Sequence, residues 1–241
     1  MPVVTAYSRP RTVQEAVLLS RNPSAVVIGG GTTLHGSGGD RRVEVVDLQA
    51  TGLDHIDAAG AEAVRIGATA TLQQLVDHEA LPAVVREAAR RERPSTLRNQ
   101  VTVGGCVATG DAESELLAAL LAHDAFVTVL GEGGSEDAPL EAVLDGLPLE
   151  RGRLVTAVTV ATGGRAAVAR TARTRADKPI VVAVARSTGG APRVALAGVA
   201  RRPVVVATAE GLAPPGDFRG SGEYRAAVAA VLLRRAVEAL Q

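Results

Sequence analysis

Short β-branched runs divided by turn residues dominate the hydrophobic pattern at the start of the chain. Residues 26–28 and 43–46 are two such runs, and each predicts a strand. Three glycines and then residues 32–34 (Thr-Thr-Leu) separate them. Ahead of the first run, Thr12 and Glu15 have the spacing of a capping box, which predicts a short helix. The pattern therefore indicates a compact α+β unit around a glycine-rich turn.

The next region carries two helix signals. Thr71 and Gln74 repeat the capping-box spacing, and residues 72, 75 and 76 supply an apolar face. Pro82 suits the first turn of a further helix that runs to about residue 91. Because residues 90–93 are all charged, we expect the end of this second helix to lie in solvent.

The centre of the chain reads as strands around a leucine-rich helix. Residues 64–66, 125–130 and 154–161 predict strands. Asp111 is placed to cap a helix over residues 112–123. The buried stripe of that helix is expected to be Leu116, Leu117, Leu120 and Leu121. We expect residues 131–138 (GEGGSEDA) to be flexible and residues 140–144 to form a short helix.

A domain boundary is expected near residues 163–164 (Gly-Gly). Residues 180–185 and 193–199 predict paired strands that turn at residues 187–190. Residues 204–206 are ambiguous between strand and helix because they are β-branched but follow a proline. Ser221 is expected to cap a final amphipathic helix. The residues expected near one face of it are Tyr224, Val228, Val231, Leu232 and Leu240.

Composition and charge narrow the class of protein. The chain has 241 residues, of which 46% are hydrophobic, so we expect a globular protein. Its 26 basic and 26 acidic residues cancel, which argues against nucleic acid or an anionic membrane as partner. No apolar run approaches the ~20 residues that a membrane span requires. No secretion signal is visible, and we expect a cytoplasmic protein.

Reactive side chains are sparse. A single cysteine, Cys106, excludes an internal disulfide, a Cys-rich zinc site and an iron-sulfur cluster held by this chain's thiolates alone. Cys106 has apolar neighbours, which favours a small buried residue over a nucleophile. The four histidines lack metal-ligand spacing. We therefore expect no metal site and no catalytic residue, and any reactivity would come from a cofactor.

Two glycine-rich segments are the candidate binding elements. The first nearly matches a Rossmann fingerprint and a P-loop, but Leu34 stands where the former needs glycine and Ser37 where the latter needs lysine. The second segment contains Gly104 and Gly105 between apolar residues. Each segment is compatible with a backbone-lined anion site or with an ordinary tight turn.

Together, the ordered segments carry a family resemblance. They are GGGTTL at residues 29–34, RN at 98–99, TVGG at 102–105, TRADKP at 174–179 and RVALAGV at 193–199. The chain resembles the FAD-binding medium subunit of the xanthine dehydrogenase and carbon monoxide dehydrogenase family of molybdenum hydroxylases. The last helix, with SGEYR at 221–225 and VLLRRA at 231–236, is also similar to that family.

The resemblance implies an α+β fold with a PCMH-type FAD-binding domain at residues 1–162. Its two α+β subdomains would cover about residues 1–55 and 56–162. Residues 163–241 would form an antiparallel-sheet-plus-helix domain like the C-terminal domain of the CO dehydrogenase flavoprotein.

The resemblance also implies a set of site residues. Residues 29–33 would cradle the FAD pyrophosphate with backbone amides, and TVGG would belong to a second FAD loop. Glu115 takes the position of a nucleotide-contacting acid, and Lys178, the only lysine of the chain, would lie near the flavin. The implied cofactor-binding residues are Gly29, Gly30, Gly31, Thr32, Thr33, Leu34, Thr102, Gly104, Gly105, Cys106, Thr109, Asp111, Glu115 and Lys178.

The implied function is electron transfer within a complex. A large molybdopterin-binding subunit and a small [2Fe-2S] subunit would be partners, and FAD would pass electrons to NAD, a quinone or oxygen. This sequence departs from the family at Glu92, Arg93, Cys106 and Ala112 and in a short segment at 131–153. The charged residues 90–93 and the short segment motivate one alternative, a flavin-poor scaffold subunit of the same kind of complex. A free-standing FAD oxidoreductase of related fold is a second alternative.

Overall fold

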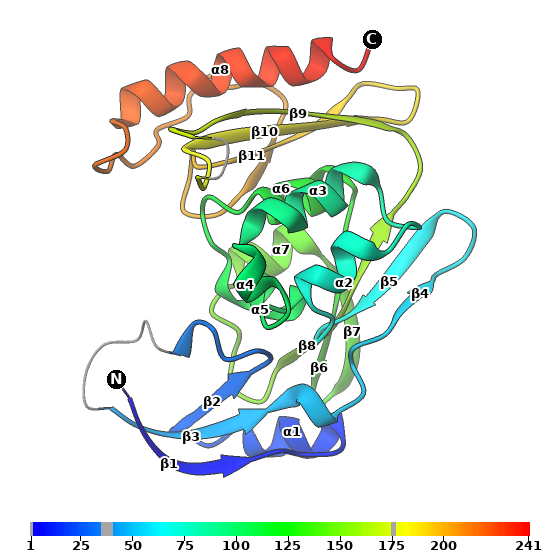
Figure 1. Cartoon of the computed structure of the whole chain (residues 1–241), viewed down its shortest axis with the longest axis vertical. Coiled ribbons are helices and arrows are strands. Elements are labelled where there is room, and N and C mark those ends of the chain that lie inside the picture. Colours follow the sequence, from blue (N-terminus) through cyan, green and yellow to red (C-terminus); the bar gives the residue numbers. More distant parts are fainter. Residues whose placement is uncertain (1, 35–40, 175–176) are drawn as a thin grey trace.

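The computed structural model describes residues 2–34, 41–174 and 177–241. Its elements form three layers along the long axis of the molecule (Figure 1). A small sheet with one helix holds the N-terminus, a group of helices packs on a larger sheet in the middle, and a third sheet lies under the C-terminal helix. The two chain ends therefore lie in opposite end layers.

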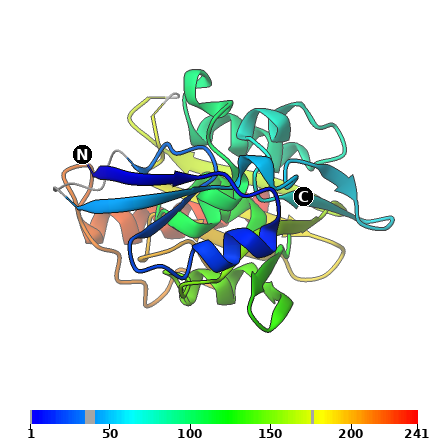
Figure 2. The ribbon, with the colours of Figure 1, turned by 90° about the horizontal axis from the view of Figure 1, so that it is seen from below.

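The N-terminal layer is a three-stranded parallel sheet with the order β1-β3-β2. Its strands are β1 (Val3–Ser8), β2 (Ala25–Ile28) and β3 (Arg42–Asp47), and the helix α1 (Val13–Leu19) connects the first two. Seen from below, α1 lies beside this sheet (Figure 2). The predicted cap is present, since the Thr12 side chain accepts the Glu15 N–H at 3.2 Å. Strand β1 has mostly exposed side chains, and for this reason its sequence gave no core signal.

The middle layer contains a five-stranded antiparallel sheet with the order β4-β5-β8-β6-β7. Its strands are β4 (Ile56–Ala58), β5 (Ala63–Gly67), β6 (Phe126–Gly131), β7 (Gly134–Pro139) and β8 (Leu154–Ala161). The helices of this layer are α2 (Leu72–Asp77), α3 (Ala83–Glu92), α4 (Ser95–Arg98), α5 (Val103–Thr109), α6 (Glu115–Ala122) and α7 (Leu140–Asp145). A short 3-10 helix, η2 (Leu48–Ala50), leads from the first sheet to this layer.

The expectation of a flexible segment at residues 131–138 was wrong. These residues turn back from β6, and β7 pairs with β6 along its whole length as the edge of the sheet. The side chains of an edge strand can point into solvent, so an acidic sequence is compatible with a strand there. The Thr128 hydroxyl donates to Asp137 at 2.6 Å across this pair.

Helix α6 is buried on all sides rather than along one stripe, because each of its residues from Glu115 to Ala122 is inaccessible to solvent. It also begins later than expected. Ser114 is its cap and accepts the Leu117 N–H at 3.0 Å. The predicted capping role of Asp111 was wrong, because Asp111 accepts the Glu113 N–H in the preceding turn. The helix is the central element of the main core.

The C-terminal layer is an antiparallel sheet with the order β12-β11-β10-β9. Its strands are β9 (Arg165–Thr171), β10 (Val181–Ser187), β11 (Arg193–Ala197) and β12 (Val204–Val206), and α8 (Gly222–Glu238) covers one face (Figure 1). The other face packs on α6, so alternate residues of β10 belong to different cores. The predicted pairing of the two central strands is confirmed, and the ambiguous residues 204–206 form a strand.

Ser221 caps α8 as predicted, but the expected apolar face was partly wrong. Tyr224 and Val231 are exposed. The buried side of the helix includes a charged residue, Arg225, which is 3% exposed. The other residues buried on this side are Ala229, Leu232, Ala236 and Leu240. Arg225 was missed because a charged residue on an amphipathic helix is normally assigned to its solvent face.

Candidate functional site

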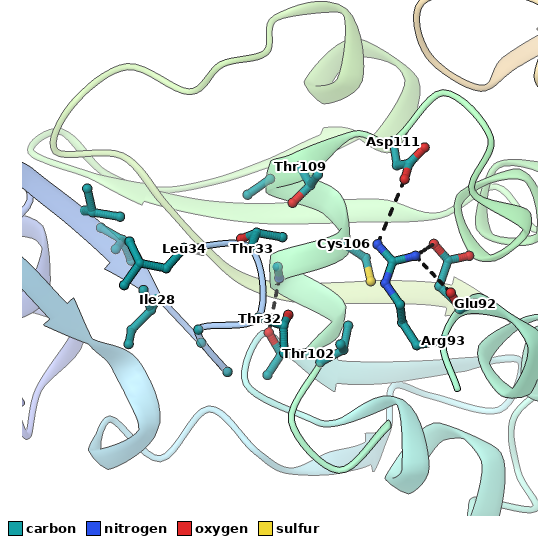
Figure 3. Close-up of a pocket in the computed structure, with 18 of the residues that line it drawn as sticks. Ile28, Thr32, Thr33, Leu34, Glu92, Arg93, Thr102, Cys106, Thr109 and Asp111 are labelled. Atoms are coloured by element: carbon teal, nitrogen blue, oxygen red, sulfur yellow. Dashed lines mark hydrogen bonds and ion pairs between the residues drawn. The ribbon is translucent and has the colours of Figure 1, made fainter. Parts of the chain in front are cut away.

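A cavity of about 320 Å³ lies between the glycine turn after β2 and helix α5. Figure 3 shows Thr32, Thr33 and Leu34 on one side of it, with the side chain of Cys106 opposite. Its walls come from separate layers of the fold, since the turn belongs to the N-terminal layer and α5 to the middle layer. The cavity therefore forms only when the two layers are in contact.

Glycines are required where the turn meets the middle layer. A Cβ atom on Gly30 would lie 1.6 Å from the carbonyl oxygen of Gln100, and one on Gly29 would lie 2.5 Å from the Thr102 hydroxyl. Gly31 has a φ of 69°, which L side chains rarely adopt. The three glycines thus let the backbone turn sharply while it touches the segment that leads into α5.

The second glycine pair lies inside a helix and not in a loop, which corrects the expectation of a second glycine loop. Thr102 caps α5 and accepts the Gly105 N–H at 3.2 Å. A Cβ on Gly104 would lie 2.7 Å from Ala68, so this glycine allows α5 to pack on the chain after β5. Gly105 faces the cavity. The two glycines therefore have different roles.

One end of the cavity is charged. Arg93 lies between the carboxylates of Glu92 and Asp111 (Figure 3). Its Nη1 lies 3.8 Å from Glu92 Oε1, and its Nη2 lies 3.9 Å from Asp111 Oδ2. The expectation that the end of α3 is solvated was wrong for Glu92, whose side chain is 3% exposed and accepts the Leu116 N–H at 3.2 Å. Glu92 was missed because its partner is 24 residues away.

Lys178 and Glu115 lie outside the cavity lining. The Lys178 ammonium donates to Asp111 at 2.5 Å and lies 3.5 Å from Glu113. Burial alone would raise the pKa of Asp111, but the hydrogen bond from Lys178 brings that pKa below its usual value. Glu115 is 1% exposed and pairs with Arg91 at 3.0 Å and Arg170 at 3.1 Å.

Most of the predicted residues converge. Those that line the cavity are Gly29, Gly30, Gly31, Thr32, Thr33, Leu34, Thr102, Gly105, Cys106, Thr109 and Asp111. Gly104 lines an adjoining cavity of about 260 Å³ on the other side of the glycine contact. Glu92 and Arg93, expected only as departures from relatives near the flavin side of the site, also line it. Sequence reasoning missed a further set of lining residues, which are Val26, Val27, Ile28, Arg41, Val101 and Ala108. Contacts of any of these residues with FAD stay predictions.

Cys106 is a buried residue, as predicted, with 8% of its surface exposed. Burial raises the pKa of its thiol far above the usual value, so the thiol stays neutral.

His35, Ser37, Arg175 and Ala176 lie outside the described residues. Across residues 2–34, 41–174 and 177–241, no group of three or more His, Cys, Asp or Glu side chains could hold a metal ion. None of the helices in those ranges has the length and apolar character needed to cross a bilayer.

Comparison with known proteins identifies the family. The family described as the FAD binding domain in molybdopterin dehydrogenase matches residues 3–162. The chain is 32% identical to the protein YgfM of Escherichia coli, across 96% of this chain and 94% of that protein. It is 28% identical to the carbon monoxide dehydrogenase medium chain of Afipia carboxidovorans, across 96% of this chain and 95% of that one.

A solved structure, the reconstituted CO dehydrogenase from Oligotropha carboxidovorans, matches the whole fold. It has a TM-score of 0.87 at 26% identity and covers 99% of this chain and 98% of that chain. The chain belongs to the family of FAD-binding medium subunits of the molybdenum hydroxylases. The predicted family, α+β fold class, FAD cofactor and class of FAD-dependent oxidoreductase subunits are confirmed.

The residues of the cavity fit a dinucleotide with a pyrophosphate. The turn at residues 29–33 has no bulky side chain at Gly29 to Gly31, so its backbone can approach an anion closely. The hydroxyl-bearing residues Thr32 and Thr33 line the same end. Amide and hydroxyl donors can solvate a pyrophosphate without a metal ion. The adjoining cavity extends the available space beyond the glycine contact.

Glu92 gives the cavity a pH-dependent stability. Burial raises the pKa of its carboxyl, and its hydrogen bonds and Arg93 offset this only in part. A raised native pKa stabilises the fold below the unfolded pKa of about 4.3, and this contribution is lost as pH rises through the native pKa. Glu92→Gln keeps an acceptor for the Leu116 N–H but cannot ionise. We expect its melting temperature to be close to that of the wild type at pH 4, to exceed it as pH rises, and the difference to level off once pH is above the native pKa of Glu92. A difference that is constant across this range would contradict the assignment.

Proposed function

We propose that this chain is the FAD-binding electron-transfer subunit of a molybdenum hydroxylase complex of the CO dehydrogenase kind. The observation that carries the proposal is the cavity between the glycine turn and α5, in which glycine is sterically required at Gly29 and Gly30. Relatives that span almost the whole chain support it.

The residues of this chain would bind and position the cofactor. Backbone amides of the turn at residues 29–33 and the hydroxyls of Thr32 and Thr33 would hold the pyrophosphate. Thr102 and Gly105 would form the opposite wall. When bound, FAD supplies the electron-accepting and electron-donating chemistry. The neutral Cys106 thiol would contribute packing rather than a nucleophile.

The partners and the direction of electron flow belong to the proposal. A small iron-sulfur subunit would deliver electrons that a large molybdopterin-binding subunit takes from the substrate. NAD, a quinone or oxygen would receive them from this chain. The relative named a medium chain of carbon monoxide dehydrogenase supports this division of labour. A substrate site on this chain is not part of the proposal.

The first test is binding of FAD to the purified chain. We expect one FAD per chain, a yellow protein and a higher melting temperature. At a free FAD concentration of 100 times Kd, binding should add about 2.7 kcal/mol to the free energy of unfolding. Fluorescence titration and thermal unfolding measure the two quantities. A chain that takes up no FAD at any concentration would overturn the proposal.

The second test separates the alternatives. The chain is co-expressed with candidate molybdopterin-binding and iron-sulfur subunits and purified by a tag on the large subunit. Co-purification with flavin supports the proposal, whereas co-purification without flavin supports a scaffold subunit. Reduction of the flavin by a small substrate in the isolated chain would instead support a free-standing oxidoreductase.

A further inference from the structure

The cavity has two chemically distinct ends. The turn at residues 29–33 presents backbone and hydroxyl groups. The opposite end presents Arg93, Glu92 and Asp111 beside Cys106 (Figure 3). If the amides and hydroxyls of the turn bind the pyrophosphate, the charged end of the cavity contacts a different part of the same cofactor. This step rests on the proposed function.

Arg93 is held in place while part of its guanidinium stays accessible. Its Nη1 donates to the Glu92 backbone carbonyl at 2.9 Å, and carboxylates lie on both sides of the group. Its side chain remains 26% exposed and lines the cavity. A guanidinium is planar, keeps its charge and offers five donors, so it suits a flat ring with carbonyl acceptors.

Lys178 contacts the same network from outside. It reaches Asp111 but not the cavity, and Asp111 in turn faces Arg93. Of the two carboxylates beside Lys178, Asp111 is the one that lines the cavity, so the direct contact route from Lys178 to a ligand there runs through Asp111. Neutralising the lysine would leave Asp111 with one cation fewer and draw it towards Arg93.

We propose that Arg93 is the residue that contacts the flavin ring, and that Lys178 is a positioning residue that acts on Arg93 through Asp111. A cation beside the ring stabilises the negative charge that the ring gains on reduction. Arg93 therefore raises the ratio of the affinities for reduced and oxidised FAD. Lys178 contributes to that ratio only while Arg93 is present.

The experiment compares Arg93→Gln, Lys178→Gln and the double variant by the midpoint potential of bound FAD. We expect Arg93→Gln to lower the affinity ratio about tenfold, which is about 30 mV for a two-electron couple. Lys178→Gln should give a smaller shift that disappears in the Arg93→Gln background. Arg90→Gln is the matched control, because Arg90 is an exposed arginine in the last turn of α3, shortly before Arg93 and outside the cavity, and it should leave the potential unchanged.

The affinity of each variant for FAD and for riboflavin is a second readout. It can be measured even when a variant binds FAD too weakly for its midpoint potential to be determined. Arg93→Gln should weaken both ligands by the same factor, because the contact is to the ring. Loss of FAD affinity with unchanged riboflavin affinity would assign Arg93 to the pyrophosphate or the adenosine and overturn the inference. An unchanged potential in Arg93→Gln, or a Lys178→Gln shift that persists without Arg93, would also overturn it. A wild-type chain that binds no FAD would instead overturn the proposed function.

Discussion

Gly30→Ala is expected to reduce the affinity for FAD about 5- to 150-fold. The new Cβ would lie 1.6 Å from the Gln100 carbonyl oxygen. The Cβ is fixed to its own backbone and the carbonyl is a backbone group, so no side-chain rotation can separate them. Overpacking of this kind costs about 1–3 kcal/mol, which corresponds to that loss of affinity if the turn moves to relieve it. Fluorescence titration with FAD measures the change, and thermal unfolding of the FAD-free protein measures any loss of stability.

Gly133→Ala is the matched control for this prediction. Nothing lies within 4 Å of a Cβ at Gly133, which is in the turn between β6 and β7 and away from the cavity. We expect its FAD affinity to equal that of the wild type. Wild-type affinity and stability in Gly30→Ala would mean that the turn does not press against Gln100, and the cavity wall would have to be redrawn.

Arg225→Met is expected to lower the free energy of unfolding by about 3–5 kcal/mol, as found when one partner of a buried ion pair is removed. Arg225 lies on the buried side of α8 and donates to the carbonyl oxygens of Ile180 at 2.7 Å and Gly198 at 3.1 Å. It also pairs with Glu113 at 3.0 Å and Asp217 at 2.8 Å. Methionine fills a similar volume but satisfies none of these acceptors. Urea unfolding at pH 7 measures the loss.

Arg234→Met is the matched control. It tests whether removal of any positive charge from α8 is enough to lower the free energy of unfolding. Arg234 lies on the same helix with 68% of its side chain exposed and pairs only weakly with Glu238 at 3.7 Å. Exposed pairs of this kind contribute about 0–1 kcal/mol. Equal losses in the two variants would refute the assignment of Arg225 as a buried connection.

Local signals in the sequence predicted a large part of the fold. The caps at Thr12, Thr71 and Ser221 are present because each involves a backbone group only three residues away. Strand β8 matches its predicted bounds because residues 154–161 are almost continuously apolar and buried. The glycine turn was located correctly because the strands on both sides of it are rich in β-branched residues.

Other features depend on contacts that no local pattern records. Strands β1 and β9 show little burial of their own, and their identity comes from pairing with other strands. The partner of β1 is β3, which follows α1 and β2, and the partner of β9 is β10, which lies beyond a long connection. Glu92 and Arg225 are charged residues whose partners lie 24 and up to 112 residues away, so each was assigned to solvent by its type. Arg93 was noticed as a departure from relatives, but only the structure placed it between two carboxylates.

The complete burial of α6 has a consequence for folding cooperativity. On the face that it turns towards the C-terminal layer, α6 shares one apolar core with Val182 and Val184 of β10 and with Ala195 and Ala197 of β11. The family match ends at residue 162, before any of these strands begins. A fragment cut there would expose a leucine-rich helix face to water and lose much of its driving force for folding. The segment that defines the family therefore holds only part of the apolar core that surrounds α6.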